Sequence, residues 1–262
     1  MFMKKGILFA LVALLAPFAN AAKTITPKTP ALVDDCYEIS SAEELYGFAD
    51  LLGTFNPSFG GCVKLTADIV VNENVLTEDD SLNVADTANF VPWIPMSKFF
   101  GVFDGQNHTV SGLYYVKMAD TTLFAAQAHA GLFSELRSLQ GSATVVKNLG
   151  IVDSYFFNET EDVGAIVGSV GYGSAVSIEN CFSHARIEVK GVFEYAGGMI
   201  GEVRGSASVK NCRASGIFVS SSVGASGGIV GYIDEDASAS IENSTNSAYI
   251  NAVHDTWAWR VA

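Results

Sequence analysis

One short phrase recurs along the second half of this chain, and its repetition constrains the fold more than any other feature. It is built on glycines and appears as Gly131-Leu132-Phe133, Gly164-Ala165-Ile166-Val167-Gly168, Gly198-Met199-Ile200-Gly201 and Gly228-Ile229-Val230-Gly231. The first glycines are separated by 33, 34 and 30 residues. Self-similarity at a period of about 20–50 residues is typical of repeat architectures, in which each unit packs against its neighbours.

A second phrase follows each copy of the first and carries an asparagine. The four versions are VVKNLGIVDSYF, SIENCFSHARIEV, SVKNCRASGIFV and SIENSTNSAYI, and their asparagines are Asn148, Asn180, Asn211 and Asn243. These are spaced by 32, 31 and 32 residues, so two separate anchors share one period. We interpret the asparagines as an internal amide ladder at a turn; the alternative is a row that binds a ligand.

Each repeat unit has the composition of short strands and turns. Apolar residues alternate with polar ones, and Gly, Ser and Asn separate the runs, without helical periodicity in residues 131–250. One unit cannot enclose a core, but stacked units place equivalent residues about 4.8 Å apart. The residues therefore predict an all-β solenoid with an internal Ile/Val/Leu ladder and with Gly and Asn at its corners.

The segment before the repeats predicts a helix. Ser41 and Glu44 have the spacing of a capping box, and apolar residues follow at helical intervals. We expect a capping α-helix over about residues 41–53, ended by Gly53. The polar and acidic residues 73–91 are expected to form a loop.

The N-terminus has the pattern of a secretory signal. Two lysines precede an apolar run over residues 6–18, and Ala19-Asn20-Ala21 is a small-x-small cleavage pattern. Removal of residues 1–21 changes the charge from −13 to −15, because only Lys4 and Lys5 are lost. We expect an exported protein with no membrane span in the mature chain. The acidic balance disfavours nucleic acid as a partner.

The expected organisation of the chain has four parts. They are the signal peptide 1–21, a leader 22–35, an N-terminal cap with the first coils 36–98, and the repeats 99–262. Export permits disulfides between the four cysteines, with Cys36–Cys62 and Cys181–Cys212 as the local pairs; reduced, buried thiols are the alternative. We expect Cys181 and Cys212 to stack as neighbours in either case.

The segment Phe103-Asp104-Gly105-Gln106-Asn107-His108-Thr109-Val110-Ser111-Gly112-Leu113, followed by the glycine phrases, resembles proteins with the GLUG motif. The resemblance covers about residues 37–250, and Gly227-Gly228-Ile229-Val230-Gly231 matches best. It implies a right-handed parallel β-helix in an exported bacterial protein, extracellular or on the cell surface with the periplasm left open, and it implies no reaction. Peptidase, adhesive or sorting segments accompany such repeats in the family, and none is visible in this chain.

Searches for catalytic chemistry give no constellation. HExxH and calcium-loop motifs are absent and the four histidines lie far apart in sequence, so no catalytic residue, metal or cofactor is expected. Lys147, Glu179, Lys210 and Glu242 precede the repeated asparagines, and we interpret them as an outer ladder of alternating charge rather than an active site. A looser acidic group, Asp153, Glu161 and Asp162, is interpreted as a solvated edge, and His184 and Arg186 as surface residues.

Aromatic residues near the unit boundaries are interpreted as core filling under loops, with sugar stacking as the alternative. They are Tyr114, Tyr115, Tyr155, Phe156, Phe157, Phe193 and Tyr195. Trp257 and Trp259 could cover the last coil, which we expect to be thinly covered and open to self-association.

The function expected from these features is a non-enzymatic scaffold or adhesin-like module. Its partner would be a polysaccharide or another macromolecule. The alternative is a carbohydrate-active β-helix enzyme, either a polysaccharide lyase or a hydrolase, which would need paired carboxylates beside a groove.

Overall fold

The structure, a computed structural model, describes residues 23–54, 60–119, 129–139, 141–191, 194–220 and 224–252. Strands account for 53% of the described residues, and the described part has one α-helix. The expected signal peptide and Trp257 and Trp259 lie outside the described residues, as does Phe193. The chain is therefore mostly β, as its sequence predicts.

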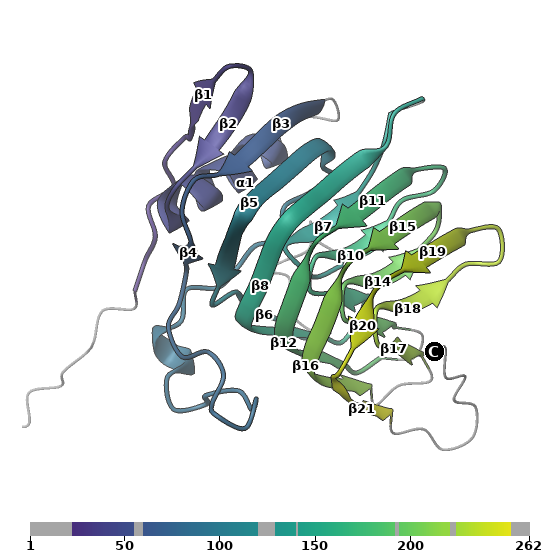
Figure 1. Cartoon of the computed structure of the whole chain (residues 1–262). Coiled ribbons are helices and arrows are strands. Elements are labelled where there is room, and N and C mark those ends of the chain that lie inside the picture. The colour runs from purple at the N-terminus through teal and green to yellow at the C-terminus, as the bar shows by residue number, and fades with distance from the viewer. Residues whose placement is uncertain are drawn as a thin grey trace, which may run out of the picture.

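Most strands belong to one large sheet, whose main path crosses the molecule in chain order (Figure 1). The path comprises β1 (Ala31–Val33), β2 (Cys36–Ile39), β3 (Gly60–Leu65), β5 (Phe100–Ser111), β8 (Thr144–Asn158), β11 (Ala175–Glu179), β15 (Ser206–Lys210) and β19 (Ser238–Glu242). Further strands pair off this path, namely β4 (Ile69–Val70), β6 (Tyr114–Lys117), β12 (Phe182–Val189), β16 (Arg213–Ser220), β20 (Thr245–Asn246) and β21 (Tyr249–Ala252). All of these pairings are parallel except β1 with β2.

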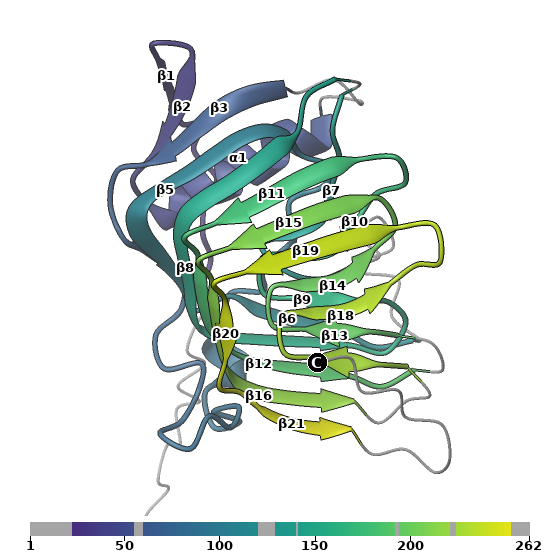
Figure 2. The same ribbon diagram turned by 45° about the vertical axis from the view of Figure 1, so that its right-hand side comes forward.

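The glycine phrases form two smaller parallel sheets, visible in Figure 2. One consists of β7 (Phe133–Leu136), β10 (Val167–Val170), β14 (Ile200–Val203) and β18 (Val230–Ile233), and the other of β9 (Val163–Gly164), β13 (Ala196–Gly197) and β17 (Ser226–Gly227). Val167 pairs with Phe133 on one side and with Ile200 on the other, and Ile200 pairs with Val230. The repeat period of the sequence is thus the register of the sheets.

The register corrects our alignment of the first glycines by one residue. Gly197 pairs with both Gly164 and Gly227, so Gly164 is level with these residues and not with Gly198 and Gly228. The spacing of 34 that we read between Gly164 and Gly198 therefore joins two different positions. The second glycines of the phrases are Gly168, Gly201 and Gly231. Each directly follows a residue that is paired between strands, so these three glycines lie level with one another.

The core lies between the sheets and is made of stacked aliphatic and aromatic residues. Val146, Ile178 and Val209 are paired in succession along the large sheet, and all three are fully buried. At the N-terminal end, the aromatic residues Phe99, Phe103 and Phe133 contact one another through their rings. This continuous core is the internal ladder expected from the sequence.

The predicted helix is present as α1 (Ala42–Thr54) and covers the N-terminal end of the core (Figure 2). Ser41 Oγ accepts a hydrogen bond from the backbone N–H of Glu44 at 3.3 Å, as in a capping box. The helix continues through Gly53 instead of ending there, which corrects the predicted end. Phe48 is fully buried and packs against Phe99. The expected loop 73–91 contains a short 3₁₀ helix, η1 (Thr87–Asn89).

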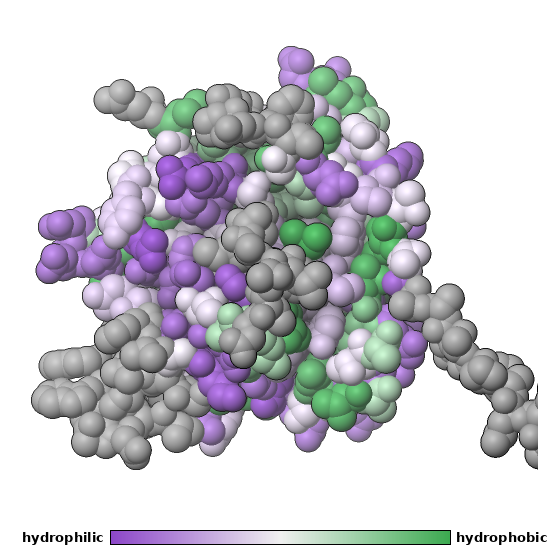
Figure 3. All heavy atoms as spheres, turned by 180° about the vertical axis from the view of Figure 1, so that it is seen from behind, coloured by the Kyte–Doolittle hydropathy of each residue, from purple (hydrophilic) through white to green (hydrophobic). Residues whose placement is uncertain are grey.

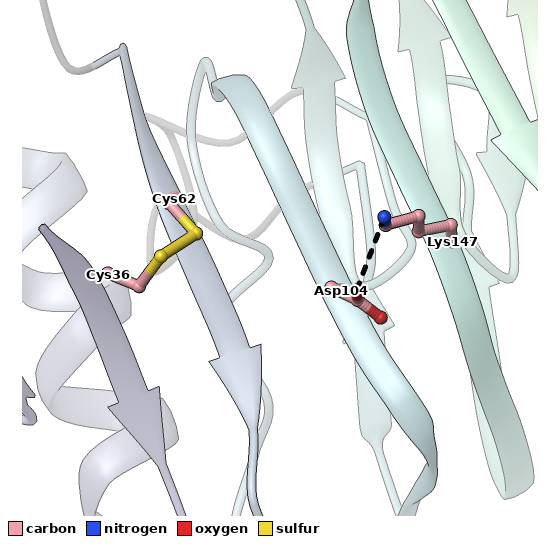
Figure 4. The surroundings of a disulfide bond; sticks show 4 residues. All are labelled: Cys36, Cys62, Asp104 and Lys147. Carbon is pink, nitrogen blue, oxygen red and sulfur yellow. Dashed lines mark ion pairs between the residues drawn. A yellow bond between two sulfur atoms is a disulfide. The ribbon is translucent and has the colours of Figure 1, made fainter. Parts of the chain in front are cut away.

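The four cysteines form one disulfide and one pair of free thiols. Cys36 and Cys62 pair across β2 and β3 with Cα atoms 4.4 Å apart and form a disulfide (Figure 4). Cys181 and Cys212 are free thiols, so the disulfide suggested for this pair is wrong in this structure. They stack as expected, because the residues on either side are paired and the Cys181 N–H lies 3.4 Å from the Cys212 Sγ. The alternative of buried thiols describes this second pair.

The repeated asparagines mark the corner at which the large sheet bends. Asn148, Asn180, Asn211 and Asn243 all have positive φ, between 48° and 53°. Asn180 Nδ2 donates to Asn148 Oδ1, and Asn211 Nδ2 to Asn180 Oδ1, each at 3.1 Å. The ladder is therefore real, but it lies on the exposed side of the corner and is not internal as we expected. A left-handed conformation turns the amide outward, toward the amide of the neighbouring coil.

The second glycines allow the two small sheets to approach each other closely. A Cβ atom built on Gly201 would lie 2.8 Å from the Val163 nitrogen, and one on Gly168 would lie 2.7 Å from the Ala130 nitrogen. Both neighbours are backbone atoms, which cannot rotate away. Glycine is therefore required by space at these positions and not by its φ angle.

We predict that Gly201→Ala lowers the free energy of unfolding by at least about 2 kcal/mol, because the methyl group would force two backbones apart. The matched control is Gly53→Ala in α1, where a Cβ would have no neighbour within 4 Å. That change should raise stability by about 0.5–1 kcal/mol, the helix propensity difference. Urea unfolding measures both values, and a Gly201→Ala chain as stable as the wild type would contradict the packing argument.

Candidate functional site

A column of alternating charge runs along the outside of the large sheet. The predicted members Lys147, Glu179, Lys210 and Glu242 are paired in that order. The register extends the column in the other direction through Asp104, Lys64 and Glu38, one residue per strand. Seven successive strands thus carry charges of alternating sign, as expected for an outer ladder.

Asp104 is the best-bound member of this column. Its carboxylate accepts hydrogen bonds from the Asn148 amide at 2.9 Å and from the Gln106 N–H at 2.9 Å, and it lies 3.3 Å from the Lys147 ammonium (Figure 4). Burial alone would raise the pKa of Asp104, but these three donors outweigh it and hold the pKa below its ordinary value. The charge column and the amide ladder therefore join at Asp104.

A second polar cluster is buried beside the small sheets. We call it the His129 cluster; its members are His129, Glu161, Asp162, Glu202 and Arg204. His129 Nδ1 lies 3.1 Å from Asp162 Oδ2 and 3.6 Å from Glu161 Oε2. Arg204 lies 3.8 Å from Asp162 and forms an ion pair with Glu202. His129, Asp162 and Glu202 are each at most 8% exposed, so the cluster is an unusual concentration of buried charge.

The carboxyl groups of the His129 cluster interact strongly. Burial and, after it, the neighbouring Asp162 carboxylate together raise the pKa of Glu202 to about 7, against the opposing effect of Arg204 and His129. Glu202 therefore holds a proton more readily than an ordinary carboxyl group and, when protonated, can donate a hydrogen bond to Asp162. The nearby Tyr195, stacked on Tyr232 with ring centroids 4.1 Å apart, has its pKa raised to about 12 by burial and by that neighbour. A buried group of interacting carboxyl side chains like this one can hold a proton or a metal ion.

The cluster arises where two columns of the repeat meet. His129 and Asp162 stand at the same level of successive coils, because Ala130 and Val163 form a β-bridge and the Ala130 N–H donates to the Asp162 carbonyl at 2.9 Å. Glu202 belongs to the column Glu135, Ser169, Glu202 and Tyr232. The turn between these columns brings the two sets together.

Sequence reasoning missed this cluster and misplaced one of its members. Asp162 is 3% exposed, so the interpretation of Glu161 and Asp162 as a solvated edge is wrong for Asp162. Asp153 does not join them, since it accepts the N–H groups of Val75 and Leu76. A signal existed in the phrases His129-Ala130-Gly131, Asp162-Val163-Gly164 and Tyr195-Ala196-Gly197, which align once the correct glycine is chosen.

The remaining residues named in the sequence analysis, His184, Arg186 and the described aromatic residues, make contacts within the fold. His184 Nε2 lies 2.7 Å from Asp80 of the loop 73–91, and Arg186 pairs with Glu188, so both are half-buried under that loop. Among the aromatic residues, Tyr115, Tyr155, Phe156 and Phe157 are buried. Tyr114 and Tyr195 are half-buried and stack on Tyr155 and Tyr232. Core filling therefore describes the buried four.

The surface seen from behind mixes hydrophilic and hydrophobic patches (Figure 3). Exposed apolar residues of the described chain include Val84, Ile94, Met118 and Leu139. Within the described ranges, the structure contains no helix with the length and apolarity needed to cross a membrane.

Comparison with known proteins gives a likeness of fold and no family. No family model matches this chain, and no curated protein matches it in sequence. Among solved structures, it is similar to the crystal structure of a putative immunoglobulin A1 protease from Bacteroides ovatus. The two are 19% identical, the match covers 87% of this chain and 70% of the other, and the TM-score is 0.51. At this identity the likeness concerns the fold alone.

We predict that Asp104→Asn lowers the free energy of unfolding by about 1–2 kcal/mol at pH 7, because its hydrogen bonds to a charged acceptor and its ion pair are weakened. The pKa of Asp104 is depressed in the folded protein, so this stabilisation is present above about pH 4 and is lost as acid protonates the folded state. The difference between the variant and the wild type should therefore shrink as the pH falls below about 4.

The matched control is Glu242→Gln at the far end of the same column. Glu242 lies 3.3 Å from Lys210 but is 55% exposed, so its loss should cost less than about 0.5 kcal/mol. Urea unfolding at pH 7 and pH 3 compares the two variants. Equal losses at pH 7 would show that Asp104 has no special place in the column.

Proposed function

We propose that this chain is an exported, non-enzymatic scaffold of the adhesin-like kind, built from GLUG-type repeats that wind as a right-handed parallel β-helix. The in-register parallel sheets support the proposed winding, since each repeat contributes one strand to each sheet in turn. The proposed setting is the bacterial cell surface or the extracellular space, and the proposed partner is a polysaccharide or another macromolecule.

The charge column is the observation that supports a scaffold best. It places one outward residue of alternating sign on each of seven successive strands, and the neighbouring couples Asp104–Lys147 and Lys210–Glu242 form ion pairs. The amide ladder does the same for the adjacent corner. Catalysis needs singular residues that face a substrate, whereas repeated, mutually neutralised residues stabilise a long regular surface.

The disulfide supports export. Cys36 and Cys62 are bonded between β2 and β3, and such bonds persist in oxidising compartments and are rare in the cytosol. It agrees with the predicted signal sequence at residues 1–21.

The second candidate function is a carbohydrate-active enzyme, and the His129 cluster favours it. Asp162 and Glu202 form a carboxyl pair in which Glu202 holds a proton more readily than an ordinary carboxyl group, as a general acid does. Arg204 could stabilise a negative charge beside this pair. Glycoside hydrolysis needs two carboxyl groups about 5–9.5 Å apart on either side of the substrate bond. Asp162 and Glu202 are instead in direct contact, which favours the scaffold.

Binding and turnover can be measured on the same polysaccharide panel. We predict that the full chain is retained on at least one bacterial or plant polysaccharide and releases no reducing ends or unsaturated products from any of them. Glu202→Gln should leave the retention unchanged. If the wild type released products and Glu202→Gln reduced that release at least 100-fold, the enzyme proposal would replace the scaffold proposal.

We further propose self-association through the last described coil. Within the described residues, β19 pairs only with β15 and β21 only with β16, so each strand has one unpaired edge there. Apolar side chains lie on this coil: Ile241 is 42% exposed, Tyr249 66% and Ile250 36%. An exposed edge with apolar side chains favours pairing with another chain.

Sedimentation velocity of the full chain over a range of concentrations tests this proposal. We predict a reversible dimer that Ile241→Lys weakens at least 10-fold. The matched control is Val84→Lys, at a residue 74% exposed in the loop 73–91, which should leave the dimer intact. A monomer at every concentration, or equal effects of the two variants, would contradict the proposal.

A further inference from the structure

We propose that His129, Glu161 and Asp162 bind a divalent transition metal ion, with zinc as the best match. The imidazole Nδ1 and one carboxylate oxygen from each acid all lie within 4.8 Å of one another. Three ligand atoms at such separations can surround one ion, since zinc–ligand distances are about 2.0–2.2 Å for nitrogen and oxygen. Water would complete the coordination. This inference does not depend on the scaffold function proposed above.

The imidazole supplies a second, independent observation. His129 is only 8% exposed, and its Nδ1 atom has no hydrogen bond of acceptable geometry although two carboxylates lie within 3.6 Å. The Nδ1 atom is near the acids but not aligned with either of them. Leaving a buried polar atom without a partner costs about 1–3 kcal/mol. An ion between the imidazole and the carboxylates would give that atom its partner.

The backbone holds two of the ligands rigidly. The Ala130 N–H donates to the Asp162 carbonyl at 2.9 Å, which fixes the neighbouring coils at this level. The Tyr195 N–H donates to Asp162 Oδ1 at 3.0 Å and so orients the carboxylate, leaving Oδ2 toward His129. Gly168 provides the space, because a Cβ there would collide with the Cβ of His129. Hydrogen bonds behind a ligand are typical of metal sites.

Charge and access also fit an ion. Glu161 and Asp162 bring two negative charges; Arg204 is paired with Glu202 and also lies 3.8 Å from Asp162 Oδ2, so it offsets part of the Asp162 charge and leaves that of Glu161. The Glu161 side chain is 36% exposed while that of Asp162 is 4% exposed, so an ion would enter past Glu161. One imidazole with two carboxylates suits zinc better than calcium or magnesium, which prefer six or more oxygen ligands.

Zinc titration of the purified full chain, stripped beforehand with a chelator, tests the site by isothermal calorimetry. We expect one zinc ion per chain, with affinity reduced at least 10-fold by Glu161→Gln and by Asp162→Asn. Zinc should also raise the melting temperature of the wild type, because binding to the folded state alone stabilises it. Glu161→Gln is nearly isosteric at a partly exposed position, so this variant should keep the fold, which circular dichroism checks.

Two other histidine–carboxylate pairs provide matched controls. His108 lies 3.3 Å from Asp68, and His184 lies 2.7 Å from Asp80, each outside the three-ligand group found in the described residues. His108→Ala and His184→Ala should bind zinc as the wild type does. Loss of binding in these variants but not in Glu161→Gln would overturn the proposal. So would the absence of stoichiometric binding, or calcium or magnesium binding as tight as that of zinc.

Discussion

Parallel pairing in constant register is the constraint on which the rest of this structure depends. As the pairing of Val167 with Phe133 and Ile200 shows, a paired strand residue of one repeat has a fixed counterpart in the next, apart from register shifts between β5 and β8 and between β8 and β12. Equivalent side chains are then separated by about 4.8 Å, close enough to contact each other. Each column must therefore consist either of residues that pack favourably against the same residue type or of residues with complementary charges.

The columns of this chain show both solutions. Aliphatic residues such as Val146, Ile178 and Val209 stack on like residues inside, and the asparagine amides donate to one another at the corner. Like charges would repel at the same spacing, and the outer column instead alternates in sign over seven strands. The positive φ of each repeated asparagine keeps the bend at the same place in every coil.

The His129 cluster follows from the same register where the columns stop repeating. His129, Asp162 and Tyr195 occupy one level of three successive coils, and their different chemistry creates a singular place in an otherwise regular wall. Glycines let the two small sheets approach closely enough for Glu202 to reach Asp162. A repeat fold can thus acquire a buried charged site by substitution within a column.

The sequence by itself determined the β class, the repeat period, the capping helix and the alternation of Lys147, Glu179, Lys210 and Glu242, because each depends on local composition or on spacing along the chain. It could not determine which of two adjacent glycines is level with Gly164, since a shift of one residue leaves the spacing almost unchanged. The tertiary structure decided that register, and with it the burial of Asp162 beside His129. It also decided that Cys36 and Cys62 are bonded while Cys181 and Cys212 are free, because this depends on how stacked side chains are aimed across the sheet.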